Sequence, residues 1–444
     1  MLKLNKYLLS TCMTIIRQDP KSKASRRVSF ASLIGTAIEW YDFYLFGIAS
    51  ALFFNVLFFP KISPIAGIMA AYATYAVGFF ARPLGGVIFG HFGDRLSRKK
   101  MLITTLTMMG TSTSLIGLLP TYKTIGIFAP ILLVLLRCIQ GIAVGGEWAG
   151  AVVMSAEVSR EKERGFYSSW PNSGAPLGLL ISLIVFLIFS SFPHEQFLSW
   201  GWRIPFLLSF IIVIVGVYIR SQIMDSNVFI KAVKHRRPPK VPALEMLQSH
   251  FKNFLLAIGA RFIESASFYI LTVFILSYGT VELQLSKTLL LYAVMAGAIL
   301  EMFTIPYFGM LSDRIGRRPV YIFGALLMAL LAFPFFWLLQ TKNPILIFLN
   351  VIFCMCIAHA AMHGAQPAFY SELFKTRIRY SGMAIAYHLA AALSGGLTPL
   401  IATGLVEWAN GKTWPVSVYL IVLAIITITS VYLAVERAQK DISK

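Results

Sequence analysis

The sequence predicts an all-α membrane protein with twelve transmembrane helices in two parallel six-helix repeats, and three observations support this. First, 57% of the 444 residues are hydrophobic and only 13% are charged, which is too little charge to cover a soluble domain of this length. Second, apolar stretches long enough to cross a bilayer occur twelve times along the chain. Third, a polar loop motif of the first half recurs in the second half.

The twelve apolar stretches can each be placed on the chain. A membrane-spanning helix needs about 20 mostly apolar residues, and charged residues gather between such stretches rather than within them. The predicted spans are 30–56, 65–90, 100–119, 127–155, 167–191, 203–221, 252–278, 287–310, 320–340, 345–370, 381–405 and 415–435.

The longest polar stretch lies between the sixth and seventh spans and divides them into two sets of six. We therefore expect five regions: an N-terminal tail, a first six-helix bundle, a linker, a second six-helix bundle and a C-terminal tail. Their predicted limits are 1–27, 28–221, 222–250, 251–436 and 437–444.

Basic residues are distributed unequally between the two sides of the predicted membrane. If the N-terminus lies inside, the inside segments contain 30 of the 39 Lys and Arg residues, and the outside loops contain six. Because cytoplasmic loops are enriched in Lys and Arg, we expect both termini in the cytoplasm and the protein in the inner (plasma) membrane. The same loops explain the net charge of +20 without a nucleic-acid partner.

Two pairs of loop motifs indicate an internal repeat. The segment after the second span, residues 90–99, resembles the segment after the eighth, residues 309–318, and Asp313 follows Asp94 by 219 positions. In the loops after the fourth and tenth spans an acid precedes an arginine by seven positions, as Glu157 and Arg164 and as Glu372 and Arg379. Motifs repeated on the same side of the membrane imply parallel repeats.

The loop pattern Gly-x-x-x-Asp-Arg-x-x-Arg-Lys/Arg resembles the signature of the major facilitator superfamily. Further stretches are similar to its metabolite:proton symporter family, with shikimate, α-ketoglutarate and proline/betaine-type members: Gly-Thr-Ala-Ile-Glu-Trp-Tyr-Asp-Phe-Tyr from Gly35, Gly-Phe-Phe-Ala-Arg-Pro-Leu-Gly-Gly from Gly78, and Arg-Cys-Ile-Gln-Gly-Ile-Ala-Val-Gly-Gly-Glu-Trp from Arg137. The resemblance covers nearly the whole chain after residue 28. Ser97 departs from the usual glycine, which Gly316 keeps. The resemblance implies the major facilitator fold and transport by alternating access, without an enzyme's catalytic residues.

Several ionisable side chains fall inside the predicted spans, where each costs about 2.5–3.5 kcal/mol to insert. Glu39 and Asp42 are three positions apart, so they share one face of the first span, and Arg137 lies on the fourth. The resemblance implies that the first and fourth spans adjoin and that such an acid and arginine couple protons. We therefore predict Glu39, Asp42 and Arg137 as the proton-coupling residues, the alternative being a structural ion pair.

A substrate site is expected among aromatic and charged side chains in the spans. An anionic substrate favours a buried arginine, although arginines neutralised by acids leave the charge of the substrate open. Arg261 and Glu264 lie three apart and can equally pair with each other, and for Glu301 a structural role is favoured. The candidate substrate-binding residues are Trp40, Tyr41, Tyr44, Arg82, Glu147, Arg261, Glu264, Tyr269 and Tyr387.

The repeated loop charges are predicted to form an inner gate. Charge contacts between the two halves would hold this gate shut and break when it opens, and topology alone is the alternative explanation for the basic members. The candidate gate residues are Asp94, Arg95, Arg98, Glu157, Arg164, Asp313, Arg314, Arg317, Glu372 and Arg379.

His359 and His363 lie four apart on one face of the tenth span, a spacing found in metal sites. The sequence offers no third ligand of obvious geometry, so we expect polar packing or a cavity-lining role and no metal. The chain also has no Gly-x-x-x-x-Gly-Lys-Ser/Thr phosphate loop, so direct use of ATP is not expected. We expect no cofactor, with the proton gradient as the energy source.

These observations predict a proton-coupled symporter of a small organic metabolite, acting as a monomer. An organic acid such as shikimate or a carboxylate is favoured, because the start of the first span resembles those members. Proton-coupled uptake of proline or betaine is the alternative, although the osmosensory members carry a C-terminal coiled-coil extension and no heptads occur here. A solute sensor that does not transport is a third possibility. A channel or a membrane enzyme is disfavoured, since a channel needs no gate loops and no catalytic constellation is evident.

Overall fold

The computed structural model describes residues 20–95, 98–221, 250–374 and 379–438, and every regular element within these ranges is helical. The first half of the chain provides twelve elements, among them one 3₁₀ turn (η1) and one π-turn (η2). They are α2 (Pro20–Leu52), α3 (Phe54–Phe58), α4 (Pro64–Arg95), α5 (Arg98–Leu118), α6 (Tyr122–Ile125), α7 (Phe128–Val144), α8 (Glu147–Val158), η1 (Glu161–Glu163), α9 (Arg164–Ser190), α10 (His194–Gln196), η2 (Phe197–Gly201) and α11 (Arg203–Ser221).

The second half interrupts three of its spans with π-turns (η3, η4 and η5), a feature often found at functional sites. Its elements are α14 (Phe251–Ala260), α15 (Phe262–Tyr269), η3 (Ile270–Phe274), α16 (Ile275–Val281), α17 (Lys287–Ile315), α18 (Arg317–Gln340), α19 (Pro344–Phe353), η4 (Cys354–His359), α20 (Ala360–Leu373), α21 (Arg379–Ala390), η5 (Ala391–Gly396), α22 (Thr398–Trp408) and α23 (Trp414–Leu433).

Length and hydropathy identify nine helical segments of the described chain as able to cross a membrane, and the bent pair α10–η2 and α11, at 44°, makes a tenth. The long helices α2, which carries Glu39 and Asp42, and α5, which is rich in Thr and Ser, bring the described spans to twelve. The predicted all-α fold of twelve spans is therefore confirmed, and each span overlaps the stretch predicted for it.

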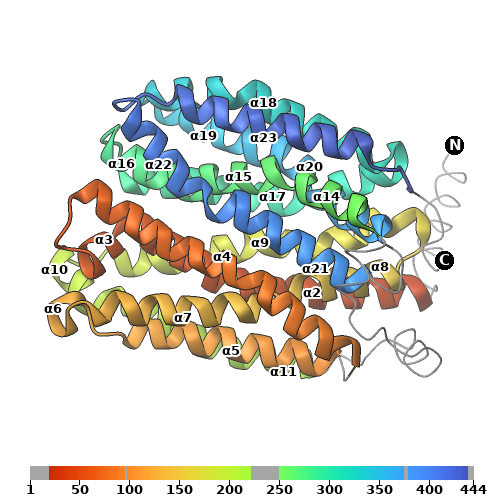
Figure 1. Ribbon diagram of the computed structural model, residues 1–444, viewed down its shortest axis with the longest axis horizontal. Coiled ribbons are helices and arrows are strands. Elements are labelled where there is room, and N and C mark those ends of the chain that lie inside the picture. Colours follow the sequence, from red (N-terminus) through yellow and green to blue (C-terminus); the bar gives the residue numbers. More distant parts are fainter. Residues whose placement is uncertain (1–19, 96–97, 222–249, 375–378, 439–444) are drawn as a thin grey trace, which may run out of the picture.

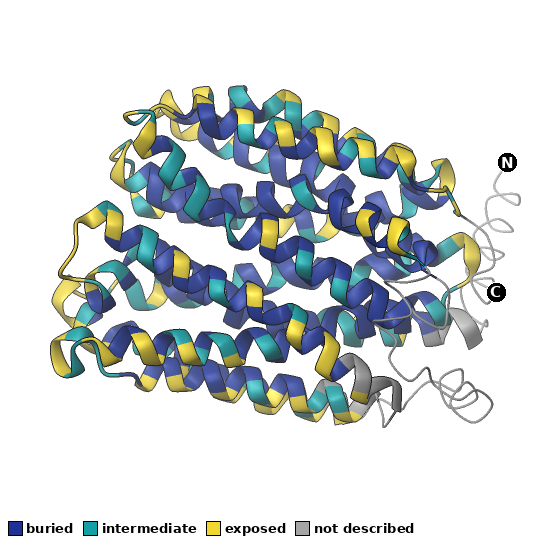
Figure 2. Ribbon diagram, viewed as in Figure 1, coloured by how far each residue is buried: buried dark blue, intermediate teal, exposed yellow. Residues whose placement is uncertain are grey.

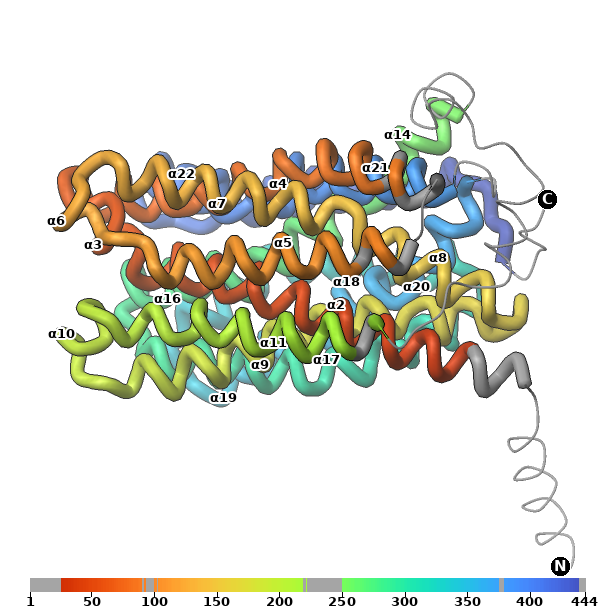
Figure 3. The backbone as a smooth tube through the Cα atoms, turned by 90° about the horizontal axis from the view of Figure 1, so that it is seen from below, coloured from red at the N-terminus to blue at the C-terminus, as the bar shows by residue number. Residues whose placement is uncertain are grey.

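The helices run along the long axis of the molecule (Figures 1 and 3), and Figure 1 shows them in two groups. In Figure 1 helices of the first half, such as α4, α5 and α7, form the lower part, and helices of the second half, such as α18, α19 and α23, form the upper part. The two groups meet where α9 packs on α17 and α4 packs on α21.

Glycines allow the closest helix contacts, as expected when small residues lie at membrane helix interfaces. A Cβ atom on Gly141 or Gly145 would come within 2.1 Å of a backbone oxygen of α4, so α7 lies directly against α4. Between the halves, a Cβ atom on Gly165 would come within 2.4 Å of the backbone oxygen of Gly309. The backbones of α9 and α17 therefore touch at this point.

The outer faces of the helices carry exposed apolar side chains, while the interior is buried (Figure 2). Phe210, Phe303 and Trp337 are each more than half exposed. Such a surface is unfavourable in water and is suited to lipid. The polar groups inside the bundle therefore have to be satisfied by each other or by a ligand.

Candidate functional site

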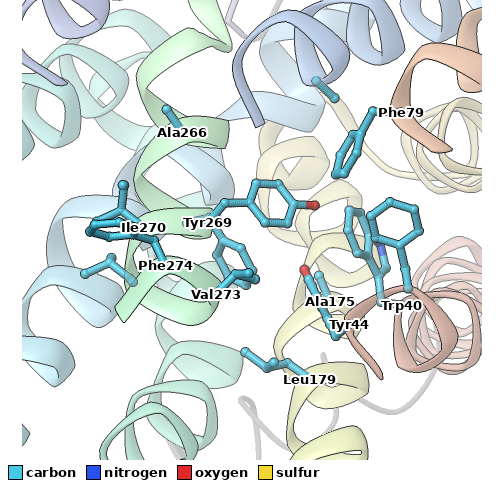
Figure 4. Packing of buried hydrophobic residues seen from close by; sticks show 14 of the residues in the cluster. Trp40, Tyr44, Phe79, Ala175, Leu179, Ala266, Tyr269, Ile270, Val273 and Phe274 are labelled. Carbon is cyan, nitrogen blue, oxygen red and sulfur yellow. The ribbon is translucent and has the colours of Figure 1, made fainter. Parts of the chain in front are cut away.

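Aromatic side chains from both halves meet at the centre of the bundle (Figure 4). Trp40 stacks on Tyr44 of the same helix with 4.9 Å between ring centroids, and Tyr44 lies 5.4 Å from Phe268 of the other half. Tyr269 reaches from α15 to Phe79 on α4 at 5.2 Å. The predicted residues Trp40, Tyr44 and Tyr269 therefore lie together, because α2, α4 and α15 converge here.

Tyr41, also predicted as a substrate residue, has a different environment. Its hydroxyl donates a hydrogen bond to the backbone oxygen of Pro205 at 2.7 Å, within the first half. Tyr41 therefore joins α2 to α11 and is not part of the aromatic group between the halves.

Two arginines of the first half lie against one aromatic ring. The guanidinium carbon of Arg82 is 3.8 Å from the centroid of the Phe43 ring, and that of Arg137 is 3.9 Å from the same centroid. Both side chains are fully buried. Aromatic faces attract cations, so these rings hold two positive charges in the middle of the bundle.

Arg82 is the least satisfied of the buried charges. None of its three guanidinium nitrogens has a hydrogen-bond partner among the described residues. The hydroxyl group of Tyr387 likewise has none in the described part of the chain, and Tyr75 and Tyr387 are both close enough to Arg82 to interact with it electrostatically. Because buried polar groups in proteins are nearly always paired, this set of donors suits an acceptor that is supplied from outside.

The predicted coupling residues Asp42 and Arg137 are connected indirectly. The hydroxyl of Ser209 donates a hydrogen bond to Asp42, and Thr113 also interacts with the Asp42 carboxyl. Arg137 donates to Gln140 at 2.7 Å, and Gln140 donates in turn to Thr113. Asp42 and Arg137 thus lie at two ends of a short polar chain, and electrostatic attraction acts between them.

The other two acids inside the predicted spans of the first half are also buried. Glu39 lies one turn before Asp42 on α2, and Glu147 begins α8. Glu147 is followed by Trp148, whose ring stacks on Tyr387 of the second half with 3.5 Å between centroids. The predicted residue Tyr387 therefore lies at the interface between the halves, next to the helix that carries Glu147.

The second half contains a densely connected polar cluster. Arg261, at the junction of α14 and α15, forms an ion pair with Glu264 at 3.3 Å and donates to Gln366 at 2.9 Å. The amide of Gln366 donates to Glu264 at 3.2 Å and to the hydroxyl of Tyr321 at 2.9 Å. The ion pair between Arg261 and Glu264, which their spacing of three positions made possible, is therefore present in the structure.

Two histidines extend this cluster. His363 Nδ1 lies 2.7 Å from Glu264 Oε1, and His359 Nε2 lies 3.5 Å from the same oxygen. His359 Nδ1 forms a hydrogen bond with Glu301. Hydropathy located these polar residues in the spans but did not indicate that three spans turn them toward one another. Gln366 and Tyr321 carry no charge to draw attention to them, and sequence analysis did not select them.

Glu264, His359 and His363 offer ligand atoms that all lie within 4.8 Å of one another, so the structure supplies the third neighbour that the sequence did not reveal. The guanidinium of Arg261 already lies 3.3 Å from Glu264. A divalent cation at this position would therefore stand beside a fixed positive charge in a dry environment, which is unfavourable. The cluster does not suit a metal.

Asn172 on α9 links this cluster to the first half. Its amide nitrogen donates to the backbone oxygen of His363 at 2.8 Å, and its oxygen accepts from the indole of Trp148 at 2.8 Å. Within the second half, the Arg261 guanidinium carbon lies 3.3 Å from the centroid of the Tyr387 ring, the ring that stacks on Trp148. The polar groups of the two halves are therefore in direct contact.

At one end of the bundle, where α2 begins and α17 meets α18, ion pairs join the halves; we call it the signature end. Arg164 pairs with Glu372 at 3.1 Å, and Arg379 lies 4.0 Å from Glu157. Each acid thus faces the arginine of the other half, not the one seven positions away in its own loop. Asp313 accepts hydrogen bonds from the backbone N–H groups of residues 165 and 166 at 2.8 and 2.9 Å, where the positive end of the α9 dipole favours an acid.

Arg317 supports these contacts from within the second half. It pairs with Asp313 at 2.8 Å and with Glu372 at 3.2 Å. Arg314 is exposed. The side chains of the remaining predicted gate residues, Asp94, Arg95 and Arg98, lie outside the described residues.

The opposite end of the bundle is closed by different contacts. The hydroxyl of Tyr72 on α4 donates to the hydroxyl of Ser277 on α16 at 2.8 Å, and both residues are buried. Beyond them lies a small pocket between α4, α16 and α22, lined among others by Ile68, Tyr278 and Thr403. The central groups are therefore enclosed from both ends.

Comparisons with known proteins agree with this architecture. The family description of the Major Facilitator Superfamily matches residues 32–399 and 257–443. The chain is 45% identical over 400 residues to the shikimate transporter of Escherichia coli, covering 89% of this chain and 91% of that protein. It is 37% identical to the proline/betaine transporter of Salmonella typhimurium, covering 90% and 81%.

A solved structure supports the fold alone, because its sequence identity is low. The proton:xylose symporter XylE with bound 6-bromo-6-deoxy-D-glucose superimposes with a TM-score of 0.74 at 17% identity. The superposition covers 95% of this chain and 98% of the symporter.

Proposed function

Because this chain belongs to the major facilitator superfamily and is a membrane transporter, not an enzyme, we propose that it carries a small organic acid into the cell together with protons. We also propose its membrane, its orientation and its oligomeric state. The protein lies in the inner membrane with both termini and the signature end in the cytoplasm, works as a monomer and needs no cofactor. The distribution of 30 basic residues on one side against six on the other supports this orientation.

The observation that carries the choice of substrate is the buried guanidinium of Arg82, which has no hydrogen-bond partner among the described residues. A buried arginine forms two parallel hydrogen bonds with a carboxylate, and the hydroxyl group of Tyr387, also without a partner there, can donate to another oxygen of the same molecule. A solute with one carboxylate and several hydroxyl or carbonyl oxygens meets all these donors. The 45% identity to a shikimate transporter supports this class of solute.

Proton coupling is assigned to Asp42. In the ionised form it is stabilised by Ser209, Thr113 and the charge of Arg137. When this support weakens during the transport cycle, a buried carboxyl takes up a proton in preference to remaining charged. Protonation then changes the relative free energies of the two open states, so that the proton gradient drives the solute in one direction.

The direct test is uptake into proteoliposomes that contain the full-length protein under an imposed pH gradient. We expect shikimate or α-ketoglutarate to accumulate and a protonophore to abolish the accumulation. The methyl ester of shikimate is the matched control, because it has the same ring and hydroxyl groups but no carboxylate for Arg82. Accumulation of the ester at the same rate as the acid would contradict the assignment of Arg82.

Uptake of a zwitterionic osmolyte is the second candidate, and the aromatic rings of Trp40, Tyr44 and Phe268 favour it, because such rings bind quaternary ammonium groups. The two arginines beside Phe43 oppose it, since they repel a cation. Proline and betaine therefore belong in the same assay. If only these two accumulate, the organic-acid proposal is wrong. If an acid raises the thermal unfolding temperature but never accumulates, the protein is a sensor.

A further inference from the structure

The second half contains five ionisable groups that the coupling scheme at Asp42 does not use. We propose that Glu301, His359 and Glu264 form a second proton-binding site, in which the imidazole of His359 holds the proton between two carboxylates. One transport cycle would then move a proton on each half. The transport consequence rests on the proposed function, whereas the protonation of His359 is a property of the resting protein and can be tested alone.

The charges of the cluster do not balance unless it holds an additional proton. Arg261 contributes one positive charge, and Glu264 and Glu301 contribute one negative charge each. All three side chains, and both histidines, are at most 5% exposed. A net charge in such an environment is strongly unfavourable, so one additional proton is needed to bring the cluster to neutrality.

The position of His359 shows where that proton belongs. Its Nδ1 is hydrogen-bonded to Glu301, while its Nε2 lies 3.5 Å from Glu264 Oε1 and has no hydrogen-bond partner among the described residues. A neutral imidazole donates from one nitrogen only, whereas an imidazolium donates from both. The imidazolium form therefore matches two carboxylates on opposite sides of the ring.

His363 is less suited to hold the extra proton. Its Nδ1 lies 2.7 Å from Glu264 Oε1, and a neutral ring with hydrogen on Nδ1 satisfies that contact without added charge. The two rings are stacked with 5.0 Å between centroids, so a second imidazolium would be repelled by the first. The pair therefore holds one proton, on His359.

Side chains from several helices surround His359. Phe268 of α15 covers the ring with 5.0 Å between centroids. The ionisable groups of the cluster and those that face its charged members are, among the described residues, Arg261 and Glu264 at the α14–α15 junction, Glu301 on α17, Tyr321 on α18, Cys356 on η4, His363 and Tyr370 on α20, Tyr387 on α21 and Tyr44 on α2. Arg261 is the positive group among them, and it is already matched by Glu264.

The site is linked to the movement of the halves through His363. Asn172 of the first half donates to the backbone oxygen of His363 and contacts its ring, and Trp148 holds Asn172 in place. When the halves separate on one side, this contact opens and water reaches the cluster. Proton exchange on His359 is therefore possible only in an open state, which is the requirement for coupling.

The test uses the full-length protein in lipid nanodiscs with ¹⁵N-labelled histidine; the chain has seven histidines, and His359→Gln identifies the signals of this one. At neutral pH we expect both ring nitrogens of His359 to show the chemical shifts of an imidazolium. In Glu301→Gln, which keeps the size of the side chain, the charge count reaches neutrality without the extra proton. His359 should then show neutral-imidazole shifts. His194→Gln, at an exposed position, is the control and should leave these signals unchanged.

Neutral-imidazole shifts of His359 in the unmodified protein at neutral pH would overturn the proposal, whatever the transport assay shows. If they are those of an imidazolium, proteoliposome uptake of shikimate tests the coupling. We expect Glu301→Gln to lower the number of protons moved per shikimate by one and to leave shikimate exchange intact. An unchanged ratio would refute the second transported proton, and absence of any shikimate uptake by the unmodified protein would instead count against the proposed substrate class.

Discussion

The two halves of this transporter handle buried charge in opposite ways. In the first half Arg82 lies among aromatic rings without a hydrogen-bond partner in the described chain. In the second half Arg261 is bound by Glu264 and Gln366, and Glu264 in turn by His363. Two repeats of the same fold therefore provide one arginine without a hydrogen-bond partner among the described residues and one arginine that is paired inside a network.

The difference has a physical consequence. A cation without a partner is costly when buried, so binding an anion there gains the full interaction. A cation that is already paired with an acid gains little from another anion, but the network around it can store a proton. The following predictions test whether the two centres are separate in this way, beginning with the largest effect.

Asp42→Asn removes the acid assigned to coupling in the first half while keeping its size. We expect complete loss of gradient-driven accumulation of shikimate in proteoliposomes, with exchange of internal and external shikimate retained. Ser209→Ala is the matched control, because it removes the hydroxyl that bonds to Asp42 but leaves the acid. Full accumulation by Asp42→Asn would remove Asp42 from the coupling role.

Arg82→Gln removes the cation assigned to the substrate. Losing a buried charged partner costs about 2–5 kcal/mol of binding, so we expect the affinity for shikimate to fall by about 100-fold in an equilibrium binding assay. The thermal unfolding temperature should not fall, because Arg82 makes no hydrogen bond in the described chain that could be lost. Arg82→Lys keeps the charge and should retain part of the affinity; an unaltered affinity in Arg82→Gln would place the substrate elsewhere.

Gln366→Leu removes the amide that connects Arg261, Glu264 and Tyr321. Leaving buried polar groups unpaired costs about 1–3 kcal/mol, so we expect a lower thermal unfolding temperature of the purified protein. This is the reverse of the result for Arg82→Gln. Gln196→Leu, at an exposed position with ordinary helical backbone angles, is the control. If Gln366→Leu unfolds at the same temperature as the unmodified protein, the network does not stabilise the second half.

Tyr72→Phe changes the contact between the halves at the end opposite the signature end. It removes the hydrogen bond to Ser277, worth about 1 kcal/mol, together with the longer contact to the backbone oxygen of Val273, and should shift the protein modestly toward opening at this end. Faster alkylation of a cysteine introduced at Thr403 in the neighbouring pocket would report this shift. Thr280→Val is the control, since the Thr280 hydroxyl bonds only within its own helix. Equal rates in both variants would show that Tyr72 does not hold this end closed.

The sequence was sufficient for the fold because hydropathy and loop motifs are local properties. The predicted spans and the superfamily are confirmed. The site was harder to predict, since it depends on how each helix is rotated about its axis. Spacing showed that Arg261 and Glu264 share a face, but not that Gln366 from another span would join them.

The gate shows the same limit. The sequence identified Glu157, Arg164, Glu372 and Arg379 from an acid and an arginine seven positions apart. Charge contacts between the halves were expected from them, but the spacing did not indicate which residues would meet: the structure joins Arg164 to Glu372 and brings Arg379 to Glu157. Contacts between helices that are far apart in the chain are determined by packing, and a single sequence does not encode them in a readable pattern.

This crosswise exchange has an evolutionary consequence. An acid replaced by a base in one half removes an ion-pair partner from the other half, at a position more than 200 residues away, as for Glu372 and Arg164. A compensating replacement must therefore arise in the opposite repeat. The two repeats can diverge at the centre of each half. At these four positions, however, a change in one repeat requires a matching change in the other.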